Sequence, residues 1–405
     1  MRVITFSPVT TGLALLPTLD LADARVHQEL ASLRGAHPGL RVPTHERRKT
    51  QSHYEDLATD DTDLRLCVWE PPPADEGDRI RVHVFPGDCA IVEFAFIPRS
   101  QTDAAAIEHE AIERTRSSVD AIRDELDALL AKVRAALPSA WIDGTVTQTA
   151  THVLWSARAL VLTPQEVPER GDLIETWLEN TARPKDAAAL IAGDIDYSMT
   201  WINYVIATDR AERFDMLCSA MRIAQFFYAR QDAINARARE ALARAFATTD
   251  VREARELFVK ARTDLQLLEI QYNELSLVIN RQKRRVIDDI MRVWDYDKLV
   301  RNGEQMVASC NSRIEEITTK RAEGSTFVTD LILTVIGFLT VIDVLLVVTQ
   351  YSREVMSRPV LEYQDSDMSW ILSAVAAIDT DSVLVGGVIS VLILLLLYVY
   401  WKLRK

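Results

Sequence analysis

Apolar and polar positions alternate in short runs over the first 200 residues. Apolar side chains occupy every second position from Leu64 to Trp69 and from Arg79 to Val84, which is the pattern of a half-buried β-strand. The run CAIVEFAFIP follows the turn PGD at 86–88, so a hairpin is expected there. Further strands are predicted at 145–156, 157–164 and 198–208, and helices at 102–137 and 168–182. Residues 1–209 are therefore expected to form a cytosolic α+β domain.

After Asp209 the apolar positions recur at helical spacing, which predicts a helical stalk domain over 210–324 with one helical stretch from about Val251 to Val293. Beyond WDYD the steps alternate strictly between three and four, a heptad seam formed by Val300, Gly303, Val307, Cys310, Ile314 and Ile317. The same register continues through Val328, Leu331, Val335, Phe338, Ile342 and Leu345. We expect one helix to run from the stalk into a membrane. The seam either joins subunits as a shared coiled coil or packs within one chain.

Two long apolar runs near the C-terminus predict a transmembrane hairpin over 325–401. The runs are Thr329–Gln350 and Val383–Trp401, and about 20 residues at 1.5 Å each match a hydrocarbon core of about 30 Å. The second run has no charge and ends in aromatic residues followed by a basic tail, as is typical of a span that ends at the membrane interface.

The distribution of Lys and Arg predicts the orientation. Basic residues precede the first run and follow the second, so both termini are expected in the cytoplasm of a bacterial inner membrane. The loop 351–381 is expected to face outward and carries two basic residues against six acidic ones, which are Glu354, Glu362, Asp365, Asp367, Asp379 and Asp381. Such an acidic mouth would concentrate cations.

The first apolar run is amphipathic, because polar residues form neighbouring stripes along it. The candidate pore-lining residues are Asp330, Thr334, Gly337, Thr340 and Asp343. A central Asp costs about 2.5–3.5 kcal/mol on insertion scales, so it is expected to face water or other subunits. Crowded carboxylates repel, so some are expected to hold protons or bind a cation. The alternative is a polar seam between helices of a non-conducting assembly.

Composition and motifs narrow the function classes further. The net charge of −13 over 405 residues argues against nucleic acid as the main partner. No phosphate-binding loop, dinucleotide fingerprint or nucleophile elbow occurs, so no enzyme activity is predicted. HEAIE at 109–113 lacks the second histidine of a zinc helix, and DLATDDTD at 56–63 lacks the glycine and distal glutamate of a calcium loop. No cofactor is predicted other than a divalent cation such as Mg²⁺.

The cluster RQKRR contains Arg281, Lys283, Arg284 and Arg285. Basic residues placed together either hold an anionic ligand, such as a nucleotide signal, or pair with acidic residues of neighbouring helices. The sequence is consistent with either an anionic-ligand site or pairing between helices.

The order of elements resembles the CorA magnesium-channel superfamily: a cytosolic α/β domain, a long helix into the first span, a short acidic loop, a second span and a basic tail. The resemblance implies a homo-oligomeric funnel, pentameric in that family, whose first membrane helices line the pore. The family's Gly-Met-Asn motif is absent, and the corresponding place reads LLVVTQYSREVMS at Leu345–Ser357. No filter residue is therefore carried over.

Three functions follow as hypotheses. The first is a CorA-like cation channel or transporter gated by its cytosolic domain. The second is a membrane effector that depolarises the cell on sensing a signal, because the chain also looks like the effectors of bacterial anti-phage systems. The third is a non-conducting anchored scaffold. Expected partners are the lipid bilayer, further copies of the chain and a cytosolic ligand or protein.

Overall fold

The structure is a computed structural model. It describes residues 1–15, 24–35, 37–43, 64–72, 77–143, 151–179, 183–199, 202–247, 252–357 and 369–403. The chain divides into two compact units, Met1–Ser312 and Arg313–Lys405. Each unit is described by itself.

The first unit is built on one sheet whose described part has eight strands. They are β1 (Arg2–Val9), β2 (Leu40–Arg41), β3 (Cys67–Trp69), β4 (Arg79–Phe85), β5 (Cys89–Phe96), β6 (Ala157–Leu162), β7 (Tyr197–Met199) and β8 (Asn203–Ala207). Their order is β2-β3-β4-β5-β1-β6-β8-β7. β6 and β8 pair in parallel, and the other pairs are antiparallel. This confirms the mixed α+β character and the β4–β5 hairpin expected from sequence.

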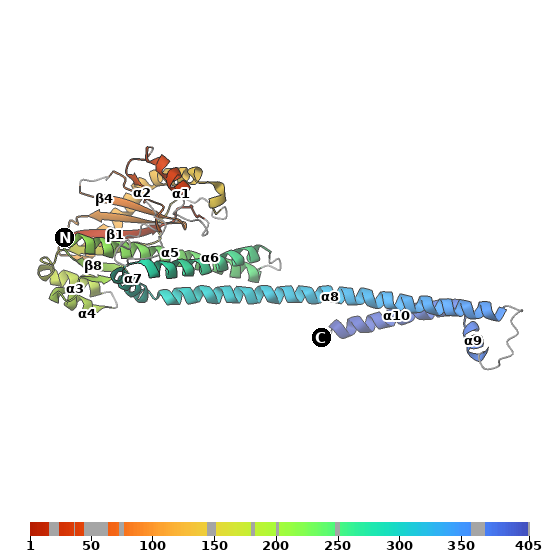
Figure 1. Cartoon of the computed structure of the whole chain (residues 1–405). Coiled ribbons are helices and arrows are strands. Elements are labelled where there is room, and N and C mark those ends of the chain that lie inside the picture. Colours follow the sequence, from red (N-terminus) through yellow and green to blue (C-terminus); the bar gives the residue numbers. More distant parts are fainter. Residues whose placement is uncertain are drawn as a thin grey trace. The chain divides into compact units, whose positions relative to one another are not determined.

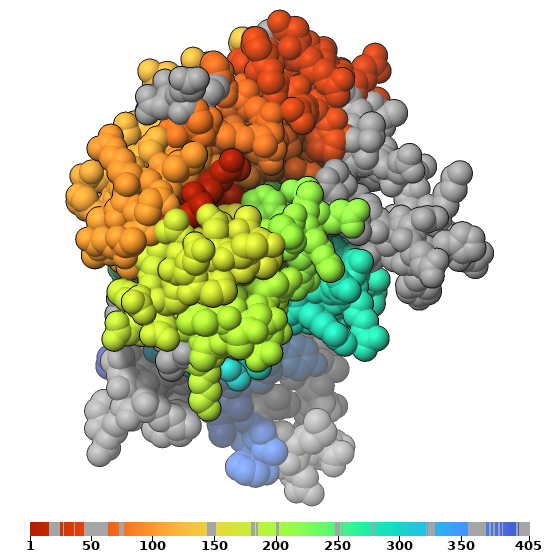
Figure 2. All heavy atoms as spheres, turned by 90° about the vertical axis from the view of Figure 1, so that its left-hand side faces the viewer, coloured from red at the N-terminus to blue at the C-terminus, as the bar shows by residue number. Residues whose placement is uncertain are grey.

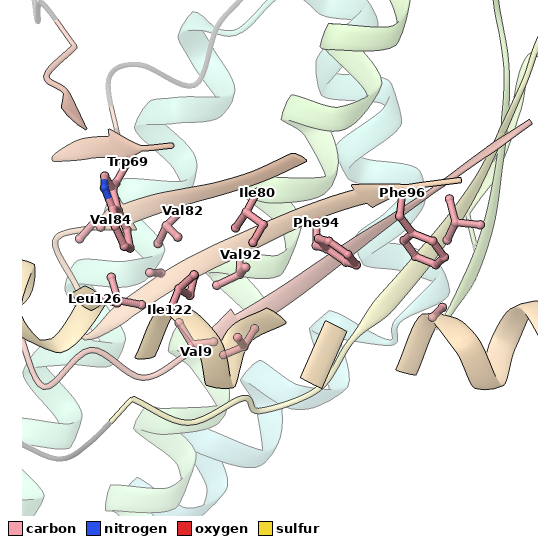
Figure 3. Packing of buried hydrophobic residues seen from close by; sticks show 14 of the residues in the cluster. Val9, Trp69, Ile80, Val82, Val84, Val92, Phe94, Phe96, Ile122 and Leu126 are labelled. Atoms are coloured by element: carbon pink, nitrogen blue, oxygen red, sulfur yellow. The ribbon is translucent and has the colours of Figure 1, made fainter. Parts of the chain in front are cut away.

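Helices cover both faces of this sheet (Figure 1). One face carries α1 (Ala24–Ser32) and α2 (Ala104–Ala136), and the other carries α5 (Ala211–Ala247) and α6 (Arg252–Val278). α2 begins where the Asp103 carboxylate accepts hydrogen bonds from the amides of residues 105 and 106, and it ends before Pro138. Its apolar residues recur at helical spacing and pack on β4 and β5, as Ile122 and Leu126 do in Figure 3.

A second core lies between the sheet and the later helices. Phe85 stacks on Phe226 of α5 with ring centroids 4.7 Å apart, and Ile287 and Ile290 of α7 (Arg281–Val293) belong to the same buried cluster. The helices that follow Asp209 therefore share a core with the sheet. The remaining elements of this unit are η1 (Leu33–Gly35), η3 (Ser139–Trp141), η4 (Pro168–Arg170), α3 (Gly171–Glu179) and α4 (Pro184–Ala192).

The predicted helix over 251–293 is interrupted. α6 ends at Val278, and α7 starts two residues after Ile279 with Asn280 as its N-cap, whose side chain accepts from the Gln282 amide. α7 ends at Val293, where the helical stretch is expected to end, and Asp295 has a φ of 52° between α7 and α8. The strand expected at 145–156 is represented, among the residues described there, by an isolated bridge between Val153 and Val9.

α8 (Tyr296–Ser357) is a single helix of 62 residues, as the continuous register predicted. Most of the second unit consists of this helix, α9 (Ser369–Ala376) and α10 (Thr380–Leu403). Gly387 of α10 lies against Ile342 of α8, because a Cβ built on it would be 3.0 Å from two side-chain atoms of Ile342. In the last turns of α8, Arg353 donates a hydrogen bond to the carbonyl of Ile378, which precedes α10, at 2.6 Å.

Candidate functional site

Part of α8 is apolar and long enough to cross a membrane. The segment Thr329–Glu354 has 26 residues, and its most apolar stretch of 18 residues has a mean hydropathy of 2.8 and contains no buried residue. Length and composition alone identify it, and it is the candidate span that the described residues contain. α10 is a helix of 24 residues, but within it the apolar stretch identified is the shorter Leu384–Ile393. The predicted two-span hairpin is therefore not confirmed.

One face of this segment packs within the second unit. Leu331, Val335, Phe338 and Ile342 are half-buried, and Thr349 and Ser352 are 3% and 0% exposed. Together with the half-buried Leu346, these positions are three or four apart and form one helical face. The predicted heptad register follows this covered face from Leu331 to Ile342 but departs from it at Leu345, which is 50% exposed.

The five candidate pore-lining residues, Asp330, Thr334, Gly337, Thr340 and Asp343, are all exposed. At 100° per residue, Thr340 lies about 180° from Leu331, which is on the packed face. Asp330 and Asp343 lie about 100° and 120° from Leu331, in opposite directions around the helix. Asp330, Thr340 and Asp343 therefore lie away from the packed face, whereas Thr334 is only about 60° from Leu331 and lies at the edge of that face.

The polar groups on this surface differ in how they are satisfied. Thr334 and Thr340 donate their hydroxyls to the carbonyls of Asp330 and Ile336, at 2.7 and 2.9 Å, so these hydroxyls are satisfied by their own helix. No hydrogen bond or ion pair joins the carboxylates of Asp330 and Asp343 to any residue that the structure describes. These two carboxylates are the groups that a second molecule or water must accommodate.

The external-loop candidates are described only in part. Glu354, Asp379 and Asp381 are exposed. Glu362, Asp365 and Asp367 lie outside the described residues, as does the segment 56–63.

The basic cluster of α7 does not form one surface. Lys283 is 0% exposed on the apolar side of the helix, three and four residues from Val286 and Ile287. Arg281, Arg284 and Arg285 are exposed, and Arg284 lies 3.7 Å from Asp288. Lys283 lies on the apolar stripe of α7, and that spacing predicts a buried side chain. The burial was missed because the four basic residues were grouped by their proximity in the sequence.

The metal-like patterns do not assemble a ligand set within the described part of the chain. His109 Nε2 lies 3.2 Å from Glu113 on an exposed helix surface, and no group of three potential ligands is found among the residues searched.

The heptad seam is partly buried inside the first unit. A Cβ at Gly303 would lie 2.3 Å from Asn235 Oδ1, so α8 approaches α5 closely there. Cys310 is also buried in this unit, as a seam that packs within one chain requires.

The four cysteines, Cys67, Cys89, Cys218 and Cys310, are free and buried. Burial raises the pKa of the Cys67 and Cys89 thiols to about 12 and also raises the pKa of Cys310. The thiolate, which is the reactive form, is therefore suppressed.

Comparison with protein-family models, with curated proteins and with solved structures finds no match.

Proposed function

We propose that this protein is a homo-oligomeric cation channel or transporter of the inner membrane, organised like the CorA superfamily, with α8 lining the pore. The observation that carries the proposal is the exposed pair Asp330 and Asp343, which lies on an apolar helix segment away from its packed face. The first unit would act as the cytosolic domain that controls opening.

Oligomerisation explains how these carboxylates are accommodated. A charged Asp facing lipid at the bilayer centre costs about 2.5–3.5 kcal/mol. Copies of α8 arranged around an axis would place the Thr340 side toward a water-filled centre and remove that cost. A ring of carboxylates is also the usual construction for cation conduction. A divalent cation such as Mg²⁺ would balance the negative charge of such a ring.

α10 fits the role of a second span that faces lipid. Its 24 residues cover about 36 Å at 1.5 Å per residue, and the sequence from Val383 to Trp401 has no charged residue. Its contact with Ile342 covers the packed face of α8 and leaves the polar side available to other subunits. Both termini would then lie in the cytoplasm.

Flux through proteoliposomes tests the proposal. Asp343→Asn keeps the shape of the side chain and removes its charge, so we expect an intact oligomer and at least a several-fold lower cation flux, with Asp330→Asn acting in the same direction. Asp124→Asn is the matched control, because Asp124 is exposed on α2 of the first unit, outside the apolar segment.

Asp343→Leu distinguishes a pore from a dry seam. In a pore this change blocks flux, whereas at a lipid-facing or dry position it stabilises the protein and leaves flux unchanged. Unaltered flux in both Asp343 variants would overturn the pore assignment. A folded oligomer without flux would favour the scaffold, and wild-type depolarisation that kills cells on overexpression would favour the membrane effector.

A further inference from the structure

The first unit contains a cavity of about 1710 Å³ to which segments far apart in the sequence contribute. One side is formed by the strands β3–β5, another by the first turns of α5 and of α7, and a third by the segment from η4 to β7. Figure 2 shows the neighbouring surface, where the start of β1 (dark red) lies between the β4–β5 region (orange) and the segment that includes α3 and α4 (yellow-green). The volume is ample for a small-molecule ligand, for which pockets of about 300–1,000 Å³ are common.

The floor of the cavity is a buried carboxylate held by two arginines. Glu93 is 7% exposed, lies 2.7 Å from Arg222 of α5 and 3.7 Å from Arg81 of β4, and pairs with Arg81 across the strands. Burial alone would raise the pKa of Glu93, but the nearby His83, whose Nε2 lies 3.5 Å away, and the charges of Arg222 and Arg81 outweigh it and hold the pKa well below its usual range. Glu93 is therefore ionised at neutral pH.

A second carboxylate, that of Glu70, lies beside the floor of the cavity and is also surrounded by several arginines. Glu70 accepts from Arg81 at 2.6 Å, from Arg41 at 2.9 Å and from Arg79 at 3.2 Å. Around Glu70 and Glu93, four described arginines surround two carboxylates, which leaves an excess of two positive charges. Arg81 is the residue that joins the two groups.

The facing wall adds a further cation and a helix N-terminus. Asn280, Gln282 and Arg285 of α7 line the cavity, whereas Arg281 and Arg284 do not. No carboxylate in the described part of the chain pairs with Arg285. Of the basic cluster in the sequence, Arg285 is therefore the cation directed to this cavity, and the amides at the start of α7 add partial positive charge.

The remaining lining is less basic and partly apolar. Ile191, Ile195, Tyr197 and Phe214 contribute apolar surface. Asp196 on the same side is paired with Arg213 at 2.5 and 2.7 Å, and Glu212 and Asp215 add negative charge. An anionic group is therefore favoured at the floor near Arg81, and an uncharged body toward Tyr197.

We propose that this cavity binds a small phosphorylated molecule, with phosphate oxygens at Arg81, Arg222 and Arg285 and an apolar or aromatic body toward Tyr197 and Phe214. Guanidinium groups recognise phosphate through paired charge-assisted hydrogen bonds. The binding site stands on its own, and a regulatory role for the ligand rests on the proposed channel function.

Calorimetry on the full-length protein in detergent tests the site, with pyrophosphate and adenosine triphosphate as probes and adenosine as the uncharged comparison. We expect both phosphates to bind and adenosine to bind far more weakly. Arg285→Gln and Arg81→Gln should each weaken phosphate binding about tenfold, since each removes a charge-assisted hydrogen bond.

Arg284→Gln is the matched control, because it makes the same change one residue away at a position that does not line the cavity. Equal effects of Arg284→Gln and Arg285→Gln, or no binding of either phosphate by wild-type protein, would overturn the site. Binding that persists while proteoliposomes show no flux would leave the site intact and overturn the channel instead.

Discussion

Glu93 illustrates how single residues determine the stability of the first unit. Its pKa is lowered in the folded protein, so the stability it contributes is complete above the unfolded value of about 4.3 and is lost as the pH falls below that value. Glu93→Gln would leave the Arg222 charge buried without its carboxylate. Breaking such a buried pair costs about 3–5 kcal/mol.

Thermal unfolding followed by tryptophan fluorescence between pH 7 and pH 3 measures this effect. We expect Glu93→Gln to unfold at a markedly lower temperature at pH 7 and to lose less stability than wild type on acidification. Glu113→Gln serves as the control, because Glu113 is 68% exposed beside His109. Parallel pH profiles for wild type and Glu93→Gln would contradict the assignment.

At the scale of residues, the sequence identified the two carboxylates of the apolar segment but not the charged cavity. The spacing of Asp330 and Asp343 on an apolar helix is a local property, and both residues are exposed in the structure. The polar positions Arg81 and His83 were expected on the solvent side of a half-buried strand. His83 is in fact 2% exposed, because strand alternation separates two faces but does not say what covers the polar one.

Gly303 sets how closely α8 approaches α5. Asn235 is held on both sides there, since its Oδ1 accepts from Gln231 at 2.9 Å and its Nδ2 donates to the Leu299 carbonyl at 2.8 Å. We expect Gly303→Ala to lower the stability of the first unit by about 1–3 kcal/mol through overpacking. Combining it with Asn235→Ala should recover part of the loss, because the two changes are coupled.

Gly337→Ala is the comparison for this prediction. It makes the same substitution in the same helix at a position where no atom lies within 4 Å of the added Cβ, and the unfolding temperature of the first unit should not fall. Thermal unfolding of the single and double variants gives the coupling. Strict additivity of Gly303→Ala and Asn235→Ala would mean that the two residues do not interact.

At the scale of elements, strong periodicity was sufficient for the long helices and the central hairpin. The helix that the unbroken register predicts is present as α8, and the helical stretch before it ends at Val293 as expected. The end of α6 at Val278 was missed, because the apolar spacing continues across it and the capping role of Asn280 appears only in the geometry. Parallel pairing of β6 with β8 joins distant segments, which local patterns do not determine.

The proposed topology makes a prediction for the whole molecule. Single cysteines at Asp381 and at Glu304 would lie on opposite sides of the membrane, since both termini are proposed to be cytoplasmic and both residues are exposed. A membrane-impermeant maleimide applied to intact spheroplasts should label Asp381→Cys within minutes and Glu304→Cys only after permeabilisation. The reverse pattern would contradict the two-span arrangement.

The burial of Cys67, Cys89, Cys218 and Cys310 gives the natural chain a practical property. Thiols that are shielded and hold their protons at neutral pH react slowly with alkylating reagents. The four native cysteines are therefore expected to add little background signal when a cysteine introduced elsewhere is labelled. A spin label or fluorophore introduced on an exposed position of α8 would report from that position alone, without a cysteine-free version having to be built first.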